Sequence, residues 1–221
     1  MTEASAAVQN LTIETGMMEL PALLRPAAEF QKTLLQIRLG ADPAAWRAPV
    51  DRAAQNAGGD SVTIALRELA RCWQARLAEV EIDKALRKFY RMNVRFPDHL
   101  DEVQGDIPES LRLDPWGQPW IYKTTAPEGF AKLDDQRYDL GPTRHPQLST
   151  LAAAIKVEPI APQWKITQRE VAGGRALEIR TAAGQLAVVQ PGAQLEGLTL
   201  AYIADGWALF ADTDGLFTVS F

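Results

Sequence analysis

The stretch Leu113-Asp114-Pro115-Trp116-Gly117-Gln118-Pro119-Trp120-Ile121-Tyr122-Lys123 decides how the middle of this chain folds. Its first half predicts a turn at Asp114-Pro115-Trp116-Gly117, because aspartate bonds forward to the backbone, proline fixes φ and glycine permits a positive φ. In its second half, Trp, Gln, Trp and Tyr occupy alternate positions from Trp116 to Tyr122. Alternate side chains of a strand share one face. The stretch therefore predicts a turn followed by a strand with an aromatic face that packs on a helix.

That helix is expected to precede the stretch, from a cap at Asp60 or Ser61 to about Met92. Apolar residues recur at steps of three and four on two faces. The first face holds Val62, Leu66, Leu69, Trp73, Leu77 and Val80, and the second holds Ala75, Ala78, Ile82, Leu86 and Phe89. The step from Val80 to Ile82 turns about 200° around the axis, so the buried face changes side near residue 80. A helix buried all round is the alternative.

Two shorter helices are expected before the long one. Pro21 begins a helix that runs to Leu39 and ends at Gly40. Asp42 caps a second helix, with Pro43 at its first position, that runs to about Ala57.

Short alternating runs separated by glycine-containing turns dominate the last third of the chain and predict a small antiparallel β domain. The expected strands are Trp164–Glu170, Ala176–Arg180, Leu186–Gln190, Leu198–Ile203, Trp207–Ala211 and Phe217–Phe221. We therefore predict an α+β protein. Its expected parts are a helical segment (1–59), an α+β domain with a long helix on a small antiparallel sheet (60–150), a linker (151–162) and a small all-β domain (163–221).

Residues 80–143 resemble the C-terminal globular domain of the major pseudopilins of type II secretion systems. In that family a long helix ends in an aromatic pair, an extended step follows, then a DPWG strand and later an LGP turn. The matching segments here are Phe89-Tyr90, Arg95-Phe96-Pro97, Asp114-Pro115-Trp116-Gly117 and Tyr138-Asp139-Leu140-Gly141-Pro142. The resemblance implies that Asp114, Pro115, Trp116, Gly117, Leu140, Gly141 and Pro142 shape the fold and are not catalytic.

The chain departs from the pseudopilin pattern in two places. It has no basic leader and no N-terminal hydrophobic helix, so we expect no membrane segment in it. Major pseudopilins also bind calcium after the LGP turn. The corresponding residues 142–147 contain no carboxylate, and because calcium prefers oxygen ligands we expect no calcium there.

Residues 163–221 resemble, more weakly, the small β domain of the inner-membrane clamp proteins of type II secretion and of related pilus-alignment lipoproteins. The resemblance rests on the pattern of strands and glycine turns between Ala187 and Phe210. It implies binding to other proteins, among them the periplasmic part of a secretin, by sheet-edge or face contacts. Trp207 and Phe210 are the candidates for partner contact, with core packing as the alternative.

Composition and residue chemistry point away from an enzyme. The 221 residues carry a formal net charge of -5, which argues against nucleic-acid binding through a strong basic footprint. One cysteine, Cys72, excludes an intramolecular disulfide, and two histidines offer little for a metal site or triad. The acidic groups around Asp134-Asp135, Asp98–Glu102 and Asp212–Gly215 are interpreted as a loop, a helix cap and a hairpin turn. We predict no catalytic residue, no cofactor and no metal.

These features predict a non-enzymatic structural or adaptor component of a type II secretion or type IV pilus-like apparatus, periplasmic or envelope-associated if an anchor was removed. Its oligomeric state is not predicted. One alternative is a soluble binding module that reuses the pseudopilin-like scaffold and has a pocket lined by the aromatics of the middle segment. A hydrolase would instead need carboxylates that converge in a cleft.

Overall fold

The computed structural model describes residues 21–125, 137–157 and 162–221, and the chain has the predicted α+β class. It divides into two compact units. Unit 1 combines Met1–Ala70 with Ile155–Phe221, and unit 2 is Arg71–Ala154. None of the described helices combines the length and the apolar composition that a membrane span requires.

If the 3-10 turn before α2 is counted, the two short helices of unit 1 begin and end within two residues of the predicted positions. After a 3-10 turn, Ala22–Leu24, helix α2 covers Arg25–Arg38, and Gly40 follows it with a φ of 80°. Helix α3 covers Pro43–Gln55, and Asp42 caps it by accepting a hydrogen bond from the Ala44 N–H at 2.8 Å. The buried residues of α2 include Ala27, Phe30, Leu34 and Ile37, which recur at the helical spacing.

Helix α4, Ser61–Asn93, begins at the predicted cap. The two carboxylate oxygens of Asp60 accept the Thr63 backbone N–H at 2.8 Å and the Thr63 hydroxyl at 2.7 Å. The boundary between the units falls within this helix, after Ala70. The first apolar face is buried as far as Leu77, but Val80 is 37% exposed, and the core of unit 2 already includes Ala75. The predicted change of buried face is therefore present but begins before residue 80.

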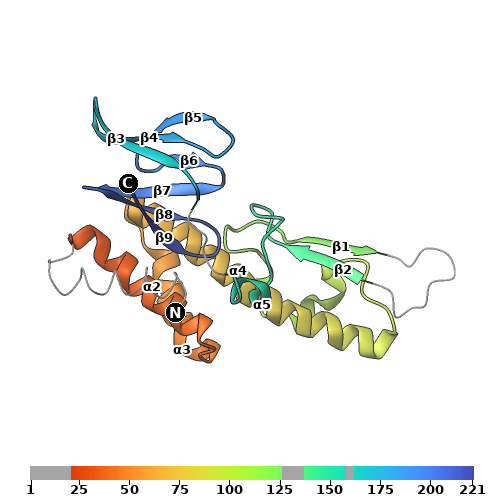
Figure 1. Cartoon of the computed structure of the whole chain (residues 1–221). Helices are drawn as coiled ribbons and strands as arrows, with labels where there is room; N and C mark the ends of the chain where they lie inside the picture. The colour runs from red at the N-terminus through yellow and green to blue at the C-terminus, as the bar shows by residue number, and fades with distance from the viewer. Residues whose placement is uncertain (1–20, 126–136, 158–161) are drawn as a thin grey trace. The chain divides into compact units, whose positions relative to one another are not determined.

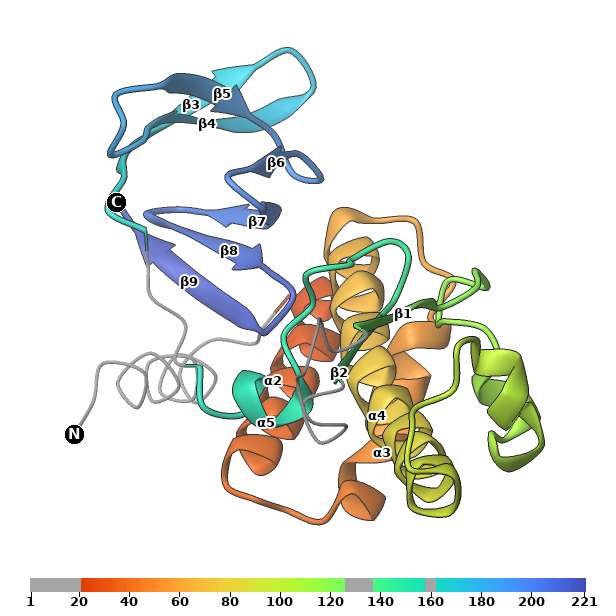
Figure 2. The same cartoon turned by 90° about the vertical axis from the view of Figure 1, so that its right-hand side faces the viewer.

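The strands of unit 1 form two antiparallel sheets (Figure 2). One has the order β3-β4-β5, with β3 at Lys165–Val171, β4 at Gly174–Arg180 and β5 at Leu186–Val189. The other has the order β6-β7-β8-β9, with β6 at Gln194–Leu195, β7 at Leu198–Ala204, β8 at Trp207–Ala211 and β9 at Leu216–Ser220. Their buried side chains make one core, which contains Leu177, Ile179, Val189, Leu200, Ile203, Ala208, Phe210, Phe217 and Val219. All six predicted strands are present, and only the two-residue β6 was missed.

Unit 1 joins segments that the sequence prediction separated. Ser61 Oγ donates a hydrogen bond to the Ala201 carbonyl oxygen at 2.8 Å, across 140 positions of sequence. Leu24 and Ala27 line a small apolar pocket together with Trp207 of the second sheet. The N-terminal helices and the C-terminal strands thus share one unit, which differs from the predicted division into 1–59 and 163–221.

Unit 2 packs a two-stranded sheet against α4 (Figure 1). Two 3-10 helices, Leu100–Asp106 and Glu109–Leu111, precede β1 (Ile121–Thr125) and β2 (Arg137–Gly141), and α5 (Leu151–Ala154) ends the unit. Trp120 joins the buried core formed by α4, and Trp116 and Tyr122 pack against it, so the predicted aromatic face is confirmed.

Two predictions for this region need correction. The strand begins at Ile121 and not at Trp116, because Pro119 has no N–H to donate and forms only an isolated bridge with Leu113. The predicted linker 151–162 starts with α5, whose Ala154 is fully buried in unit 2. Residues 158–161 of that linker lie outside the described residues.

The buried carboxylate of Asp114 holds the predicted turn and ties it to the end of β2. Its Oδ1 accepts hydrogen bonds from the backbone N–H groups of Trp116 at 3.0 Å and Gln118 at 2.8 Å. Its Oδ2 accepts the N–H of Thr143, the residue that follows Leu140-Gly141-Pro142, at 3.1 Å. One side chain therefore joins the two halves of the pseudopilin-like motif, and we call this arrangement the Asp114 clamp.

Backbone geometry and packing complete the clamp. Gly117 has a φ of 77° and donates its N–H to the Asp114 carbonyl oxygen at 2.8 Å, as the predicted turn requires. The Thr143 hydroxyl donates to the Pro119 carbonyl oxygen at 2.6 Å. Gly141 is buried, and a Cβ there would lie 3.4 Å from the Pro146 carbonyl oxygen. The end of β2 is therefore buried against the Pro146 backbone.

The clamp predicts a large loss of stability when the charge is removed. An Asp114→Asn variant leaves a buried N–H without its charged acceptor, so its free energy of unfolding should fall by about 2–3 kcal/mol. Urea titration, followed through the amide NMR signals of unit 2, measures the change. Asp139→Asn, at an exposed position of β2, is the matched control. Equal free energies of unfolding of the two variants would contradict the role of Asp114 as a clamp.

Candidate functional site

A large cleft with both charged and aliphatic lining residues lies beside β2 in unit 2, and we call it the β2 cleft. Its volume is about 860 Å³. It is lined by α4 residues Arg76, Glu79, Val80, Asp83 and Arg87, by sheet residues Ile121, Lys123, Tyr138, Asp139 and Leu140, and by Pro146, Gln147, Leu148, Thr150, Leu151 and Ala152. Residues of α4 thus form one wall, and the segment that ends in α5 forms another.

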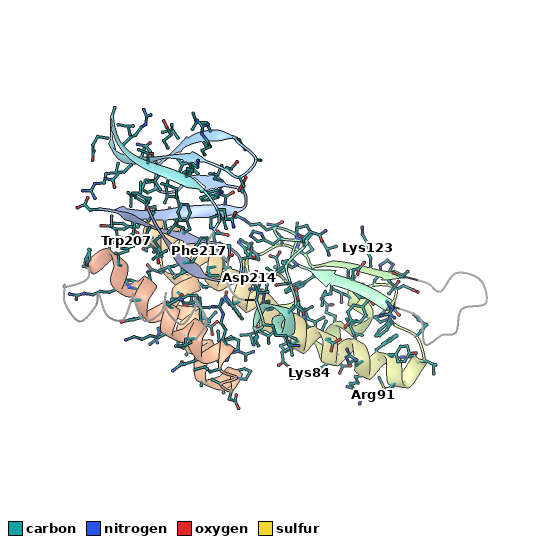
Figure 3. The ribbon with its side chains drawn as sticks, viewed as in Figure 1. Lys84, Arg91, Lys123, Trp207, Asp214 and Phe217 are labelled. Carbon is teal, nitrogen blue, oxygen red and sulfur yellow. The ribbon has the colours of Figure 1, made fainter. Side chains whose placement is uncertain are left out.

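The sheet contributes to the cleft in two ways. Ile121 and Lys123 alternate along β1 and so belong to one face of the sheet. Figure 3 shows Lys123 on the outer side of this sheet, away from α4. Tyr138, Asp139 and Leu140 are consecutive in β2, which a single face cannot provide. The cleft therefore extends around the edge of β2, and that edge makes no ladder with any other described strand.

Asp83 is fully engaged inside the cleft. It accepts a hydrogen bond from the Tyr138 hydroxyl, and its Oδ2 accepts the Arg87 Nε–H at 2.6 Å. Burial, and then the hydrogen bond to Asp83, raise the pKa of Tyr138 above its ordinary value. The hydrogen bond and charge of Asp83 likewise raise the pKa of Arg87. This triad fixes β2 on α4 and keeps the tyrosine protonated.

Arg76 is also engaged. Its side chain is fully buried, and its Nε and Nη2 donate to the carbonyl oxygen and the hydroxyl of Ser149 at 3.0 and 3.1 Å. The guanidinium lies 4.8 Å from the centroid of the Trp73 ring. A buried charge requires such partners, so Arg76 positions the segment before α5 on α4.

Glu79 is the exception among the acidic residues of the α4 wall. Its Oε1 is buried and has no hydrogen-bond partner among the described residues. Burial raises the pKa of Glu79 to about 7, and the charge of Arg76 opposes this rise. Its position also explains why sequence reasoning missed it. Glu79 lies four residues after Ala75 and three before Ile82, and so on the apolar face of α4. A carboxyl group at an apolar position of the helix was the signal in the sequence that could have identified it.

The two predicted partner-contact residues lie in different environments. Phe210 is 0% exposed and stacks in the core of the two sheets with Phe217, at a centroid distance of 5.9 Å. The partner-contact prediction for Phe210 is therefore corrected, because a core side chain presents no surface. Trp207 is half-buried beside the small apolar pocket of unit 1, and its contact with a partner stays a prediction.

Strand β5 presents the exposed apolar side chains that the sequence prediction sought elsewhere. Leu186 and Val188 are 55% and 57% exposed, and they share the outer face of the three-stranded sheet. Val189 of the same strand points to the core. Among the described strands, β5 pairs with β4 only, so one of its edges is open. All four residues of β5 are apolar, so its sequence carries no alternation that could have separated the two exposed positions from the two inward ones.

The acidic groups that the sequence analysis interpreted as a helix cap and a hairpin turn have those structural roles. Glu102 accepts backbone hydrogen bonds from Asp98 and His99 and so caps the 3-10 helix Leu100–Asp106. Asp212 accepts the backbone N–H groups of Asp214 and Gly215 in the β8–β9 turn. Cys72 is buried. The acidic pair at 134–135 lies outside the described residues. Within residues 21–125, 137–157 and 162–221, no three His, Cys, Asp or Glu side chains gather to hold a metal ion.

Comparison of the chain with family models, with curated proteins and with solved structures finds no match.

The raised pKa of Glu79 predicts a pH-dependent effect of its replacement. The folded state favours the protonated acid. The contribution of Glu79 to the free energy of unfolding is therefore highest below pH 4.5 and is lost as the pH rises through about 7. The free energy of unfolding of a Glu79→Gln variant, relative to that of the wild type, should therefore rise by roughly 1–2 kcal/mol between pH 5 and pH 8. This value is reduced to allow for partial solvent contact of the side chain.

Urea unfolding at the two pH values measures this gain. Glu81→Gln on the same helix is the control, since Glu81 pairs with Lys84 at 2.9 Å on the surface. A constant difference between Glu79→Gln and the wild type across this range would contradict the buried position of Glu79.

Proposed function

We propose that this protein is a non-enzymatic structural or adaptor component of a type II secretion or type IV pilus-like apparatus, which acts through protein contacts. The observation that carries the proposal is the open edge of β5, with Leu186 and Val188 exposed beside it. An adaptor needs such an edge or an exposed apolar patch on its β domain. The resemblances of residues 80–143 and 163–221 support the choice of apparatus.

The neighbours of β5 define the segment that would pair with it. Arg180 lies opposite Leu186 across the β4–β5 ladder, and Lys165 lies opposite Arg180 on β3. All three side chains are exposed on the same face. Glu178, opposite Val188, is paired with Arg169. An extended partner segment with apolar residues at alternate positions and an acidic residue near Arg180 would complement this face.

The alternative, a soluble ligand-binding module, required a pocket lined by the aromatics of the middle segment. Trp120 lies in the core of unit 2, and Trp116 and Tyr122 pack against that core. The lining of the β2 cleft contains Tyr138 and mainly charged or aliphatic residues. An aromatic pocket is therefore not the basis of the proposal.

The test is direct binding of the full chain to the purified periplasmic region of a type II secretin from the same organism, measured by calorimetry. Leu186→Lys with Val188→Lys should weaken binding at least about tenfold, because lysines on an edge strand oppose strand addition. Met92→Lys, at an exposed apolar position of α4, is the matched control and should bind like the wild type. Absence of binding, or equal binding by the β5 variant, would contradict the proposal.

A further inference from the structure

The β2 cleft contains an unused set of backbone groups. In an antiparallel ladder, the N–H and C=O groups of a strand point alternately to its two neighbours. Among the described strands, β2 has one neighbour, β1, in register from Arg137–Thr125 to Gly141–Ile121. The groups on its other side face the cleft, as the three consecutive lining residues of β2 indicate.

The α4 wall of the cleft contains a carboxyl group, Glu79, whose Oε1 receives no hydrogen bond from any described residue. Asp83 is bound by Tyr138 and Arg87, and Arg76 is bound by Ser149. Glu79 Oε1 has no hydrogen-bond partner among the described residues, and Arg76 acts on Glu79 through its charge. Glu79 is half-buried and lines the cleft, so part of its side chain is accessible to a group that enters the cleft.

The free edge of β2 and the carboxyl group of Glu79 lie close enough for one bound segment to contact both. Tyr138 of β2 contacts Asp83, and Glu79 lies one helical turn before Asp83. Figure 1 shows β2 running back along α4, toward the N-terminal end of the helix. A side chain at the centre of a strand laid beside β2 would point to α4 and could reach Glu79, with Val80, Leu148 and Leu151 as apolar neighbours.

We propose that the β2 cleft binds an extended segment of a partner protein, which adds to the free edge of β2 and places a lysine or arginine side chain on Glu79. Such a side chain donates a hydrogen bond to Glu79, and its charge adds to that of Arg76 beside the carboxyl group. Apolar residues two positions before and after the basic residue contact the aliphatic side chains of the cleft, Val80, Leu148 and Leu151. This site is separate from the β5 edge, although it rests on the same premise that the chain acts through protein contacts.

The probe is the peptide acetyl-Thr-Val-Thr-Lys-Thr-Val-Thr-amide, whose two valines and lysine share one face when extended. Titration of the full chain should shift the amide NMR signals of residues 137–141 and 146–152. Replacing the lysine by norleucine should weaken binding about tenfold, and Glu79→Gln should weaken it by a similar factor. Together the two changes should cost little more than either alone.

Two controls separate strand addition from other binding. N-methylation of the amides on one side of the peptide should abolish binding, and methylation of the other side should leave it, because only one side faces β2. Glu81→Gln and the β5 variant Leu186→Lys with Val188→Lys should bind the probe like the wild type, so a failure at β5 leaves this test intact. No binding, shifts confined to other residues, or equal affinity for the norleucine peptide would overturn the proposal.

Discussion

A single buried carboxylate determines how unit 2 is held together. Two-stranded sheets are marginally stable in water, and β1 and β2 have only each other as ladder partners among the described strands. Asp114 compensates for this weakness, because its two oxygens bind the chain just before β1 and just after β2. The aromatic side chains around Trp120 then pack the sheet on α4. The cleft depends on the same constraint, since the clamp fixes the end of β2 and the turn that leads to its other wall.

Local signals in the sequence determined most of the elements. Caps such as Asp42 and Asp60 act through bonds to residues two or three positions away, so the helix starts could be predicted. Glycine turns separated the strands of unit 1 in the same way. The missed elements are short: β6 has two residues and α5 has four, fewer than a period needs to become visible.

The combination of N-terminal and C-terminal segments in unit 1 could not be predicted from local patterns. The hydrogen bond from Ser61 to Ala201 spans 140 positions, and no periodicity reports such a contact. Contacts of the site residues were likewise predictable only where they are local in the sequence. The role of Asp114 in its turn was predictable, whereas its bond to Thr143 joins residues 29 positions apart. The whole stretch from Trp207 to Ala211 is apolar, which is typical of a strand covered on both faces, and the burial of Phe210 agrees with that pattern.

The measurement that tests the clamp most directly is native-state amide hydrogen exchange of the wild-type chain. The N–H groups of Trp116, Gln118 and Thr143 all bind the same carboxylate, although Thr143 follows the others by 25 or more positions. They should therefore exchange with one common free energy of opening, close to that of the buried part of α4 in unit 2. Independent and fast exchange of Thr143, while Trp116 and Gln118 stay protected, would contradict the claim that Asp114 joins the two halves of the motif.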